Sequence, residues 1–180
     1  MYEVEIKVPA DLERVRGRLD ELGATRTDAV VQADTYYDAP HRSFPKTDEA
    51  LRIRSERPEG GDDEMRLTYK GPLVDDESKT REEIETAVAD GEKVDAILTK
   101  LGFDAAATVR KDRERFALEG YAITLDSVND VGEYVEVETE AAGEADLESA
   151  REGAYEIVER LGLDPDDQIR TSYLGLLLAG

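Results

Sequence analysis

Residues 2–8 read YEVEIKV, so that Glu3, Glu5 and Lys7 alternate with apolar residues. An alternation with a period of two residues predicts a β-strand with one charged face and one apolar face. Strand-like runs recur along the chain, at 30–37, 50–57, 64–70, 81–85, 106–118, 121–127 and 133–141. We therefore expect a sheet in which nearly every strand presents charge on one side and apolar side chains on the other.

Apolar residues at helical spacing predict helices between and after these strands. The expected helices cover 9–22, a segment containing Val94 to Leu101, 146–161 and a short apolar stretch at 170–178. A segment rich in Asp, Glu and Ser at 74–79 is expected to be a linker. Most segments between the strands are too short for parallel crossovers, which favours an antiparallel sheet with the helices outside it. The fold class is therefore α+β.

The composition limits the kinds of function. The chain has 180 residues, with 44 Asp and Glu against 23 Lys and Arg, and a formal net charge of −21. This length favours one domain spanning residues 1–180, and the acidity argues against binding to nucleic acid. With no cysteine and a single histidine, His41, the chain is not expected to hold disulfides, a histidine-rich metal site or a Ser-His-Asp triad. Any bound metal must use oxygen ligands.

The sequence also suggests where the protein works. No charged and apolar leader opens the chain, and its longest apolar run, LGLLLAG at 174–180, is far shorter than the ~20 residues of a membrane span. We expect a cytoplasmic protein with no membrane partner. The acidic residues are spread along the whole length, and the 16 Arg outnumber the 7 Lys. We interpret this as a surface adapted to high salt, with an ordinary acidic cytosolic protein as the alternative.

The charged faces of the strands allow two geometries. They can be solvated on an open sheet, or they can line the inside of a closed barrel. Buried charges persist only when opposite charges, water or a charged ligand accompany them. In so acidic a protein, the cations on strand positions are informative, and they are Arg52, Arg54, Arg66, Lys70, Lys111 and Arg113. Their retention against the overall composition indicates an anionic ligand and favours the barrel.

Carboxylates two residues apart project from the same face of a strand. Glu3 with Glu5, and Glu136 with Glu138, form two such pairs. Brought together, the pairs would repel each other strongly unless a hard divalent cation, Mg²⁺ or Mn²⁺, lay between them. Cations beside a carboxylate-bound metal are typical of a polyphosphate site.

Several ordered motifs carry a family resemblance. They are Glu3-Val-Glu-Ile-Lys7, Gln32-Ala-Asp-Thr-Tyr-Tyr-Asp38, Leu51-Arg-Ile-Arg54, Leu67-Thr-Tyr-Lys-Gly-Pro72, Arg81-Glu-Glu-Ile-Glu85, Val109-Arg-Lys-Asp-Arg113, Leu125-Asp126, Tyr134-Val-Glu-Val-Glu138 and Ser172-Tyr-Leu174. The first resembles the ExExK signature of the CYTH superfamily, the triphosphate tunnel metalloenzymes, which include class IV adenylate cyclases and thiamine triphosphatases. The match extends over nearly the whole chain in the right order.

The resemblance implies an eight-stranded antiparallel β-barrel, or tunnel, with helices packed outside and a triphosphate bound inside. It implies catalytic roles for Glu5, Lys7 and Glu138. The implied metal ligands for one or two Mg²⁺ or Mn²⁺ are Glu3, Glu5, Glu136 and Glu138, with Asp126 as a further ligand or an orienting group. The implied phosphate-binding residues are Lys7, Arg52, Arg54, Lys70, Lys111 and Arg113, and Arg81 with Glu83 and Glu85 completes the wall.

Two reactions fit such a site, and a third alternative is a protein that binds a triphosphate without catalysis. A cyclase would let the ribose 3′-hydroxyl of ATP attack the α-phosphorus and release pyrophosphate, whereas an inorganic or organic triphosphatase would let water attack the terminal phosphorus. A non-catalytic triphosphate or polyphosphate sensor is the third reading. The DTYYD motif at 34–38 and the SYLGLL motif at 172–177 are most similar to the class IV cyclase branch. A homodimer is expected from the resemblance alone.

Overall fold

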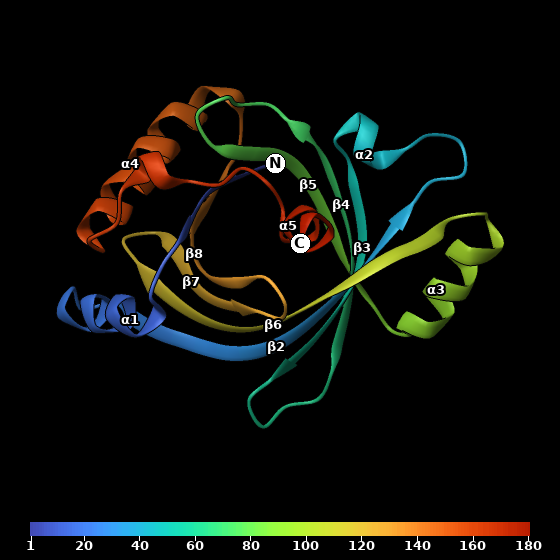
Figure 1. The fold of residues 1–180 in the computed structure, drawn as a ribbon, viewed down its shortest axis with the longest axis horizontal. Helices are drawn as coiled ribbons and strands as arrows, with labels where there is room; N and C mark the ends of the chain where they lie inside the picture. Colours follow the sequence, from blue (N-terminus) through green and yellow to red (C-terminus); the bar gives the residue numbers. More distant parts are fainter.

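The strands close into a barrel. The computed structural model describes residues 1–180. Its strands are β1 Tyr2–Pro9, β2 Thr25–Asp38, β3 Ala50–Pro58, β4 Glu64–Leu73, β5 Lys79–Val88, β6 Asp104–Leu118, β7 Tyr121–Val128 and β8 Gly132–Ala141. They pair in the order β1-β5-β4-β3-β2-β6-β7-β8, and every neighbouring pair is antiparallel (Figure 1). The expected eight-stranded antiparallel barrel is thereby confirmed.

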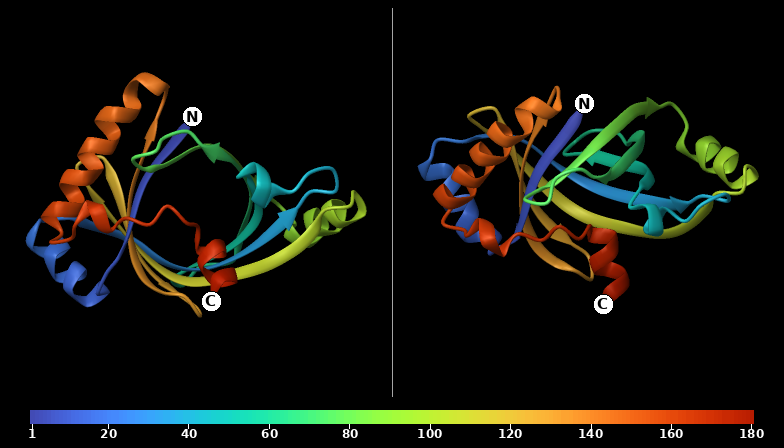
Figure 2. Two further views of the ribbon diagram at one scale, coloured as in Figure 1. Left: turned by 45° about the horizontal axis from the view of Figure 1, so that its top comes forward. Right: turned by 90° about the horizontal axis from the view of Figure 1, so that it is seen from above.

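Four helices lie around the outside of the barrel, and a fifth, the C-terminal helix, lies at one of its ends (Figures 1 and 2). They are α1 Leu12–Glu21, α2 Phe44–Thr47, α3 Gly91–Lys100, α4 Leu147–Arg160 and α5 Tyr173–Ala179. Asp11 begins α1 by accepting hydrogen bonds from the backbone N–H groups of Glu13 and Arg14. Helix α2 has only four residues and was not predicted, because a segment this short carries no helical periodicity. The expected linker at 74–79 is one residue too long, since Lys79 begins β5.

The hydrophobic core lies between the barrel and two of the helices. It joins outward-facing residues of β1, β7 and β8, such as Ile6, Ile123 and Val137, to Leu19 of α1 and Ile157 of α4. The two helices flank this side of the barrel in both views of Figure 2. Burial of these apolar side chains is the main stabilising contribution to the fold, and it uses only the outer face of the strands. Most of the inner face is thus left for polar side chains, and a smaller apolar cluster of Val109, Val128 and Tyr173 packs where α5 meets the barrel.

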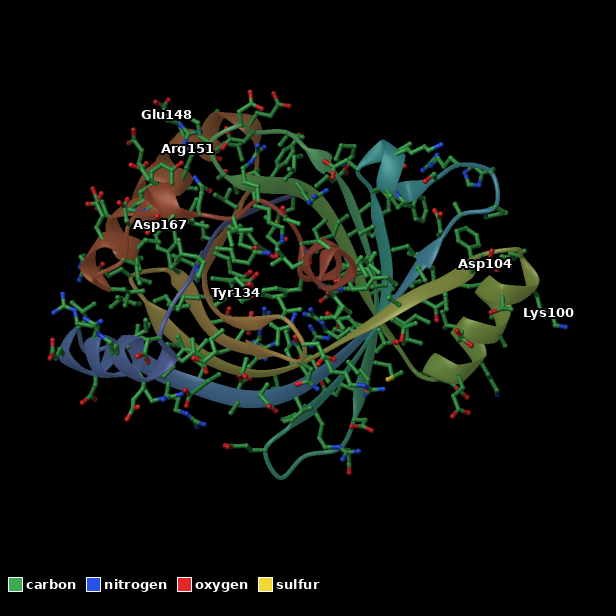
Figure 3. All side chains as sticks on the ribbon, viewed as in Figure 1. Lys100, Asp104, Tyr134, Glu148, Arg151 and Asp167 are labelled. Atoms are coloured by element: carbon green, nitrogen blue, oxygen red, sulfur yellow. The ribbon has the colours of Figure 1, made fainter.

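The inner faces of the strands carry most of the buried charge. Lys7, Asp34 and Asp126 are fully buried although each bears an ionisable group. Figure 3 shows Tyr134 of β8 directed toward the middle of the barrel, whereas Lys100 and Glu148 on the outer helices point away from it. No helix is both long enough and apolar enough to pass through a bilayer.

Candidate active site in the barrel

A cavity of about 1110 Å³ runs through the barrel, and residues 170–175, which lead into α5, line one part of it. The lining includes all but two of the predicted site residues: Glu3, Glu5, Arg52, Arg54, Lys70, Arg81, Lys111, Arg113, Glu136 and Glu138. Lys7 and Asp126 lie outside the cavity lining. Both are fully buried, and both contact Tyr173 of α5.

Three carboxylates form an acidic cluster on one wall. Glu3 and Glu5 come from β1 and Glu138 comes from β8, where it pairs directly opposite Glu5. One oxygen of each carboxylate lies within 4.8 Å of the others. We call these three residues the carboxylate cluster. It is a group of hard oxygen donors of the kind that a divalent cation binds.

The electrostatics of the carboxylate cluster reflect its crowding. Burial, together with the charge of Glu136, raises the pKa of Glu5 to about 7. Burial and the charge of Glu3 raise the pKa of Glu138 to about 8. Burial would also raise the pKa of Glu3, but the ammonium group of Lys70 holds it below its usual value. Two of the three groups therefore hold protons near neutral pH when no cation is bound.

Glu136 and Asp126 contact Arg113 rather than the carboxylate cluster. The Arg113 guanidinium donates two hydrogen bonds to Asp126, at 2.7 and 2.6 Å, and one to Glu136 at 2.5 Å. Asp126 also accepts a hydrogen bond of 2.7 Å from the Tyr173 hydroxyl. The structure thus brings together three of the five predicted metal ligands. Asp126 has the contacts of an orienting group, and its assignment as a ligand, like that of Glu136, stays a prediction.

The opposite wall has an excess of positive charge. Arg54 forms a two-hydrogen-bond ion pair with Asp34 at 2.7 and 2.8 Å. Arg52 and Lys111 each lie 3.6 Å from the same carboxylate, so three cations share one anion. We call Arg52, Arg54 and Lys111 the basic wall. Burial and the charge of Arg113 lower the pKa of Lys111 to about 7, and the Arg52 Nε is buried without a hydrogen-bond partner.

Lys7 adds a further cation beside the basic wall. Its ammonium donates to the carbonyl oxygen of Thr171 and lies 4.3 Å from the centroid of the Tyr173 ring. The Lys111 ammonium lies 4.9 Å from the centroid of the same ring, so both lysines contact Tyr173. Burial and the charge of Lys79 lower the pKa of Lys7 to about 7. This clustering of cations is unfavourable unless an anion accompanies it.

Sequence reasoning missed three residues of the site. Asp34, the anion of the basic wall, lies inside a quoted motif but received no role. Lys79 was placed in the linker, yet its ammonium lies 3.0 Å from Glu5. Tyr173, which hydrogen-bonds to Asp126, also lies inside a quoted motif but received no role. The period of two could have indicated Lys79, which shares the inward parity of Arg81 and Glu83.

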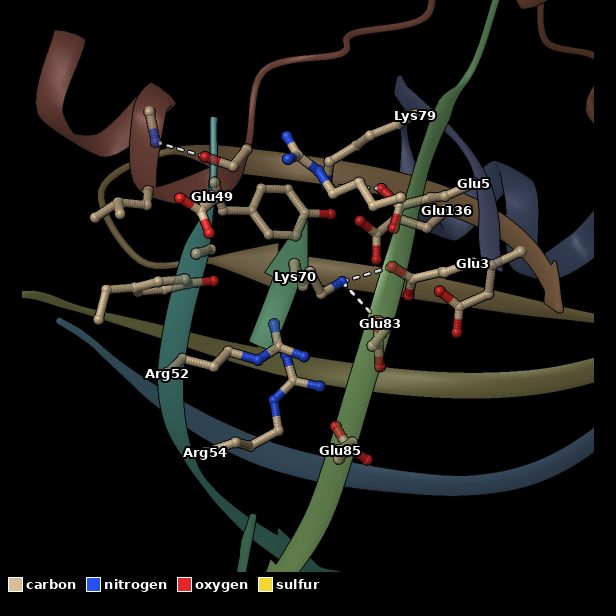
Figure 4. A pocket seen from close by; sticks show the side chains of 18 of the residues that line it. Glu3, Glu5, Glu49, Arg52, Arg54, Lys70, Lys79, Glu83, Glu85 and Glu136 are labelled. Atoms are coloured by element: carbon tan, nitrogen blue, oxygen red, sulfur yellow. Dashed lines mark hydrogen bonds and ion pairs between the residues drawn. The ribbon is translucent and has the colours of Figure 1, made fainter. Parts of the chain in front are cut away.

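Arg81 and Lys70 have partners within the protein. The Arg81 guanidinium donates to the backbone carbonyls of Asp48 and Gly71, at 2.9 and 2.8 Å, and pairs with the Asp48 carboxylate. Lys70 lies 2.6 Å from Glu3 and 3.1 Å from Glu83. Figure 4 shows these lysine and glutamate side chains meeting in the cavity, with Arg52 and Arg54 projecting toward them from β3. The phosphate-binding roles of Arg81 and Lys70 stay predictions.

Known proteins resemble this chain in sequence. A Methanocaldococcus jannaschii protein named "Putative adenylate cyclase" is 40% identical over 177 residues, which are 98% of each chain. Adenylate cyclase CyaB of Aeromonas hydrophila is 26% identical over 143 residues, 79% of this chain and 70% of that protein.

Two solved structures extend the comparison. A Pyrococcus horikoshii protein has a TM-score of 0.92 and 40% identity, covering 98% of both chains. A Hippeastrum protein described as having a dominant triphosphatase activity has a TM-score of 0.67 at 18% identity, covering 99% of this chain and 95% of that one. At that identity it supports the fold alone. The family model of the CYTH domain matches residues 1–173. The chain therefore belongs to the CYTH family.

Proposed function

We propose that this protein is a metal-dependent enzyme that binds a triphosphate in the barrel and converts ATP to cyclic AMP and pyrophosphate. The observation that carries the proposal is that the basic wall and the carboxylate cluster face one cavity inside the barrel. The three cations of the basic wall lie near a single carboxylate, Asp34. The carboxylate cluster, a group of hard oxygen donors, stands in the same cavity. A triphosphate with a divalent cation is complementary to both.

The side chains present fit a divalent metal. The carboxylate cluster supplies three oxygen ligands within reach of one another, and Glu138 has no ion pair of its own. Mg²⁺ and Mn²⁺ both prefer such ligands together with phosphate oxygens. Glu3, Glu5 and Glu138 would hold the ion. When bound, it would supply positive charge to the phosphate oxygens and to the oxygen of the attacking hydroxyl.

The protein's own groups have separate tasks in this proposal. Arg52 and Arg54 present planar guanidinium groups that grip phosphate oxygens in pairs. Lys111 stabilises the charge that develops on the phosphates as the bond to pyrophosphate breaks. Lys7 lies behind the cavity lining against the Tyr173 ring, so its predicted catalytic and phosphate-binding roles would need its ammonium to turn toward the cavity. Asp126 holds the Arg113 guanidinium in place and is itself held by the hydroxyl of Tyr173.

The choice of reaction follows the relatives. The proteins of Methanocaldococcus jannaschii and Aeromonas hydrophila carry cyclase names, and their similarity spans most of this chain. Triphosphate hydrolysis is the second candidate, because the Hippeastrum protein, which shares the fold, is described as having a dominant triphosphatase activity. Both reactions use the same phosphate-binding side chains and differ in the nucleophile and in the phosphorus atom attacked.

A product assay separates the candidates. The protein is incubated with Mg²⁺ or Mn²⁺ and with ATP, tripolyphosphate or thiamine triphosphate, and cyclic AMP, pyrophosphate and orthophosphate are then separated. Cyclic AMP with an equal amount of pyrophosphate supports the cyclase. Orthophosphate without cyclic AMP refutes the cyclase and supports the triphosphatase, and binding without any product supports a sensor.

Variants test the assigned residues. Glu5→Ala and Glu138→Ala should abolish metal-dependent turnover while the protein stays folded, whereas Glu82→Ala, on the outer face of β5, should keep it. Arg52→Ala and Lys111→Ala should chiefly weaken substrate binding. Full turnover in Glu5→Ala or Glu138→Ala would disprove the assignment of these carboxylates as ligands.

A further inference from the structure

Two lysines neutralise the side chains that we assign to the metal. The Lys70 ammonium lies 2.6 Å from one oxygen of Glu3, and the Lys79 ammonium lies 3.0 Å from one oxygen of Glu5 (Figure 4). Lys79 is held there by the pairing of β1 with β5, in which Glu5 and Lys79 are directly opposite. Lys70 reaches Glu3 from β4 and also contacts Glu83. All four side chains of the two pairs are at most 19% exposed.

The third carboxylate has no such cation. Glu138 belongs to the same cluster, with its oxygen within 4.8 Å of those of Glu3 and Glu5, but no lysine or arginine pairs with it. Ammonium groups therefore contact only two of the three members of the cluster. The space between the three carboxyl groups is where a divalent cation would bind.

A divalent cation and the two ammonium groups compete for the same oxygens. An ion bound by Glu3 and Glu5 would lie within a few ångströms of ammonium groups that contact those carboxylates at 2.6 and 3.0 Å. Like charges this close repel strongly in a buried site. Lysine has a flexible stem and a charge that makes no fixed planar contact, so its ammonium can move to a new partner. The cavity beside both lysines is where a triphosphate would lie.

We propose that Lys70 and Lys79 are exchangeable counter-ions, which pair with Glu3 and Glu5 in the empty protein and move to the phosphate oxygens when a divalent cation takes their place. This inference rests on the proposed function. The exchange makes metal and triphosphate binding cooperative, because the metal releases two cations that the triphosphate then uses. Such coupling is reciprocal between the two ligands. The lysines thereby favour the complex with both metal and triphosphate over the complex with either ligand alone.

The test measures binding and needs no turnover. Calorimetric titration with Mn²⁺ alone should show that Lys79→Met binds the ion about tenfold more tightly than the wild type, since the competing ammonium is gone. Titration with tripolyphosphate in EDTA should show little difference between the two proteins, because Lys79 is then still paired with Glu5. The same titration in excess Mg²⁺ should show an affinity for Lys79→Met about tenfold weaker than for the wild type.

Lys111→Met is the matched control, because Lys111 is equally buried but pairs with Asp34, outside the carboxylate cluster. It should weaken tripolyphosphate binding by the same factor with and without Mg²⁺, and it should change Mn²⁺ affinity by less than about twofold. Lys70→Met should repeat the pattern of Lys79→Met, which guards against one variant failing to fold. Thermal unfolding of each variant checks that it is folded.

The outcomes separate this inference from the function on which it rests. If the wild type binds both Mn²⁺ and tripolyphosphate but Lys79→Met and Lys70→Met lose tripolyphosphate affinity equally with and without Mg²⁺, the exchange is wrong and the proposed function stands. Unchanged or weaker Mn²⁺ binding in both variants also overturns the exchange. If the wild type binds neither ligand, the proposed function fails and the exchange fails with it.

Discussion

Replacing Asp34 by Asn should destabilise the empty protein and leave it unusually responsive to a triphosphate. Asp34 is fully buried and is the only carboxylate in contact with the three cations of the basic wall. Those cations hold its pKa far below the usual value despite burial, so the carboxylate is charged at every working pH. Removing one partner of a buried ion pair costs about 3–5 kcal/mol, because it leaves uncompensated charge behind.

The size of the effect can be read from a melting curve. For a domain of this size, each kcal/mol lowers the melting temperature by about 2–4 °C, so Asp34→Asn should melt about 6–20 °C below the wild type. Tripolyphosphate should restore much of this loss, because it supplies negative charge to the same three cations. In the variant, the Asp34 carboxylate no longer repels the phosphates. At a concentration of about 100 times its Kd, a ligand adds about 2.7 kcal/mol to the stability of a folded protein.

Asp63→Asn provides the control for this experiment. Asp63 also forms a pair of hydrogen bonds with an arginine, Arg57, at 2.8 and 3.0 Å, but its side chain is 45% exposed and that of Arg57 is 66% exposed. Exposed ion pairs contribute about 1 kcal/mol at most, so this variant should melt within about 4 °C of the wild type. The reasoning is refuted if Asp34→Asn melts as high as Asp63→Asn, or if tripolyphosphate raises its melting temperature no more than that of the wild type.

Three further predictions concern the carboxylate cluster, the outer core and the hydrogen bond of Tyr173. Because the pKa values of Glu5 and Glu138 are raised to about 7 and about 8, a metal must displace protons from both. Mn²⁺ affinity measured by calorimetry should therefore fall about 100-fold from about pH 8.5 to about pH 6.5, and a flat profile would contradict the ligand assignment. Leu19→Ala, in the outer core, should lower the free energy of unfolding in urea by about 2–5 kcal/mol while tripolyphosphate affinity is kept; a large loss of affinity would show that core and site are coupled. Tyr173→Phe leaves the buried Asp126 carboxylate with one donor fewer and should cost about 1–3 kcal/mol in thermal unfolding, an effect whose absence would mean that the hydrogen bond is unimportant.

The strands and their charged faces could be predicted from the sequence because the pattern that defines them is local, whereas the closure of eight strands into a barrel was expected from the family resemblance. Alternation of Glu3, Glu5 and Lys7 with Val4 and Ile6 specifies both a strand and its two faces. The recurrence of this pattern, with cations retained in an acidic chain, then indicated a closed and charged interior. The short helix α2 could not be found in this way, because its four residues give no period.

The pairing of charges inside the barrel could not be read from the chain, because it depends on register between strands. Asp34 and Arg54 are directly opposite in the pairing of β2 with β3, and Glu5 and Lys79 are opposite in that of β1 with β5. A shift of two residues in either pair would keep every side chain on its face and change every partner. The sequence therefore identifies which charges face inward, and only the fold decides which of them meet.

The main apolar core lies outside the barrel, between the strands and helices α1 and α4. Substitutions in this core and substitutions on the inner face of the barrel therefore affect different contacts. A substitution on the inner face alters charge and hydrogen bonding but removes none of the apolar contacts that join the sheet to those helices. Lining residues can therefore be exchanged in compensating pairs, such as an acid together with its cation, while the framework is preserved. A descendant of this protein could acquire a different anionic ligand by changing the inward-facing positions alone.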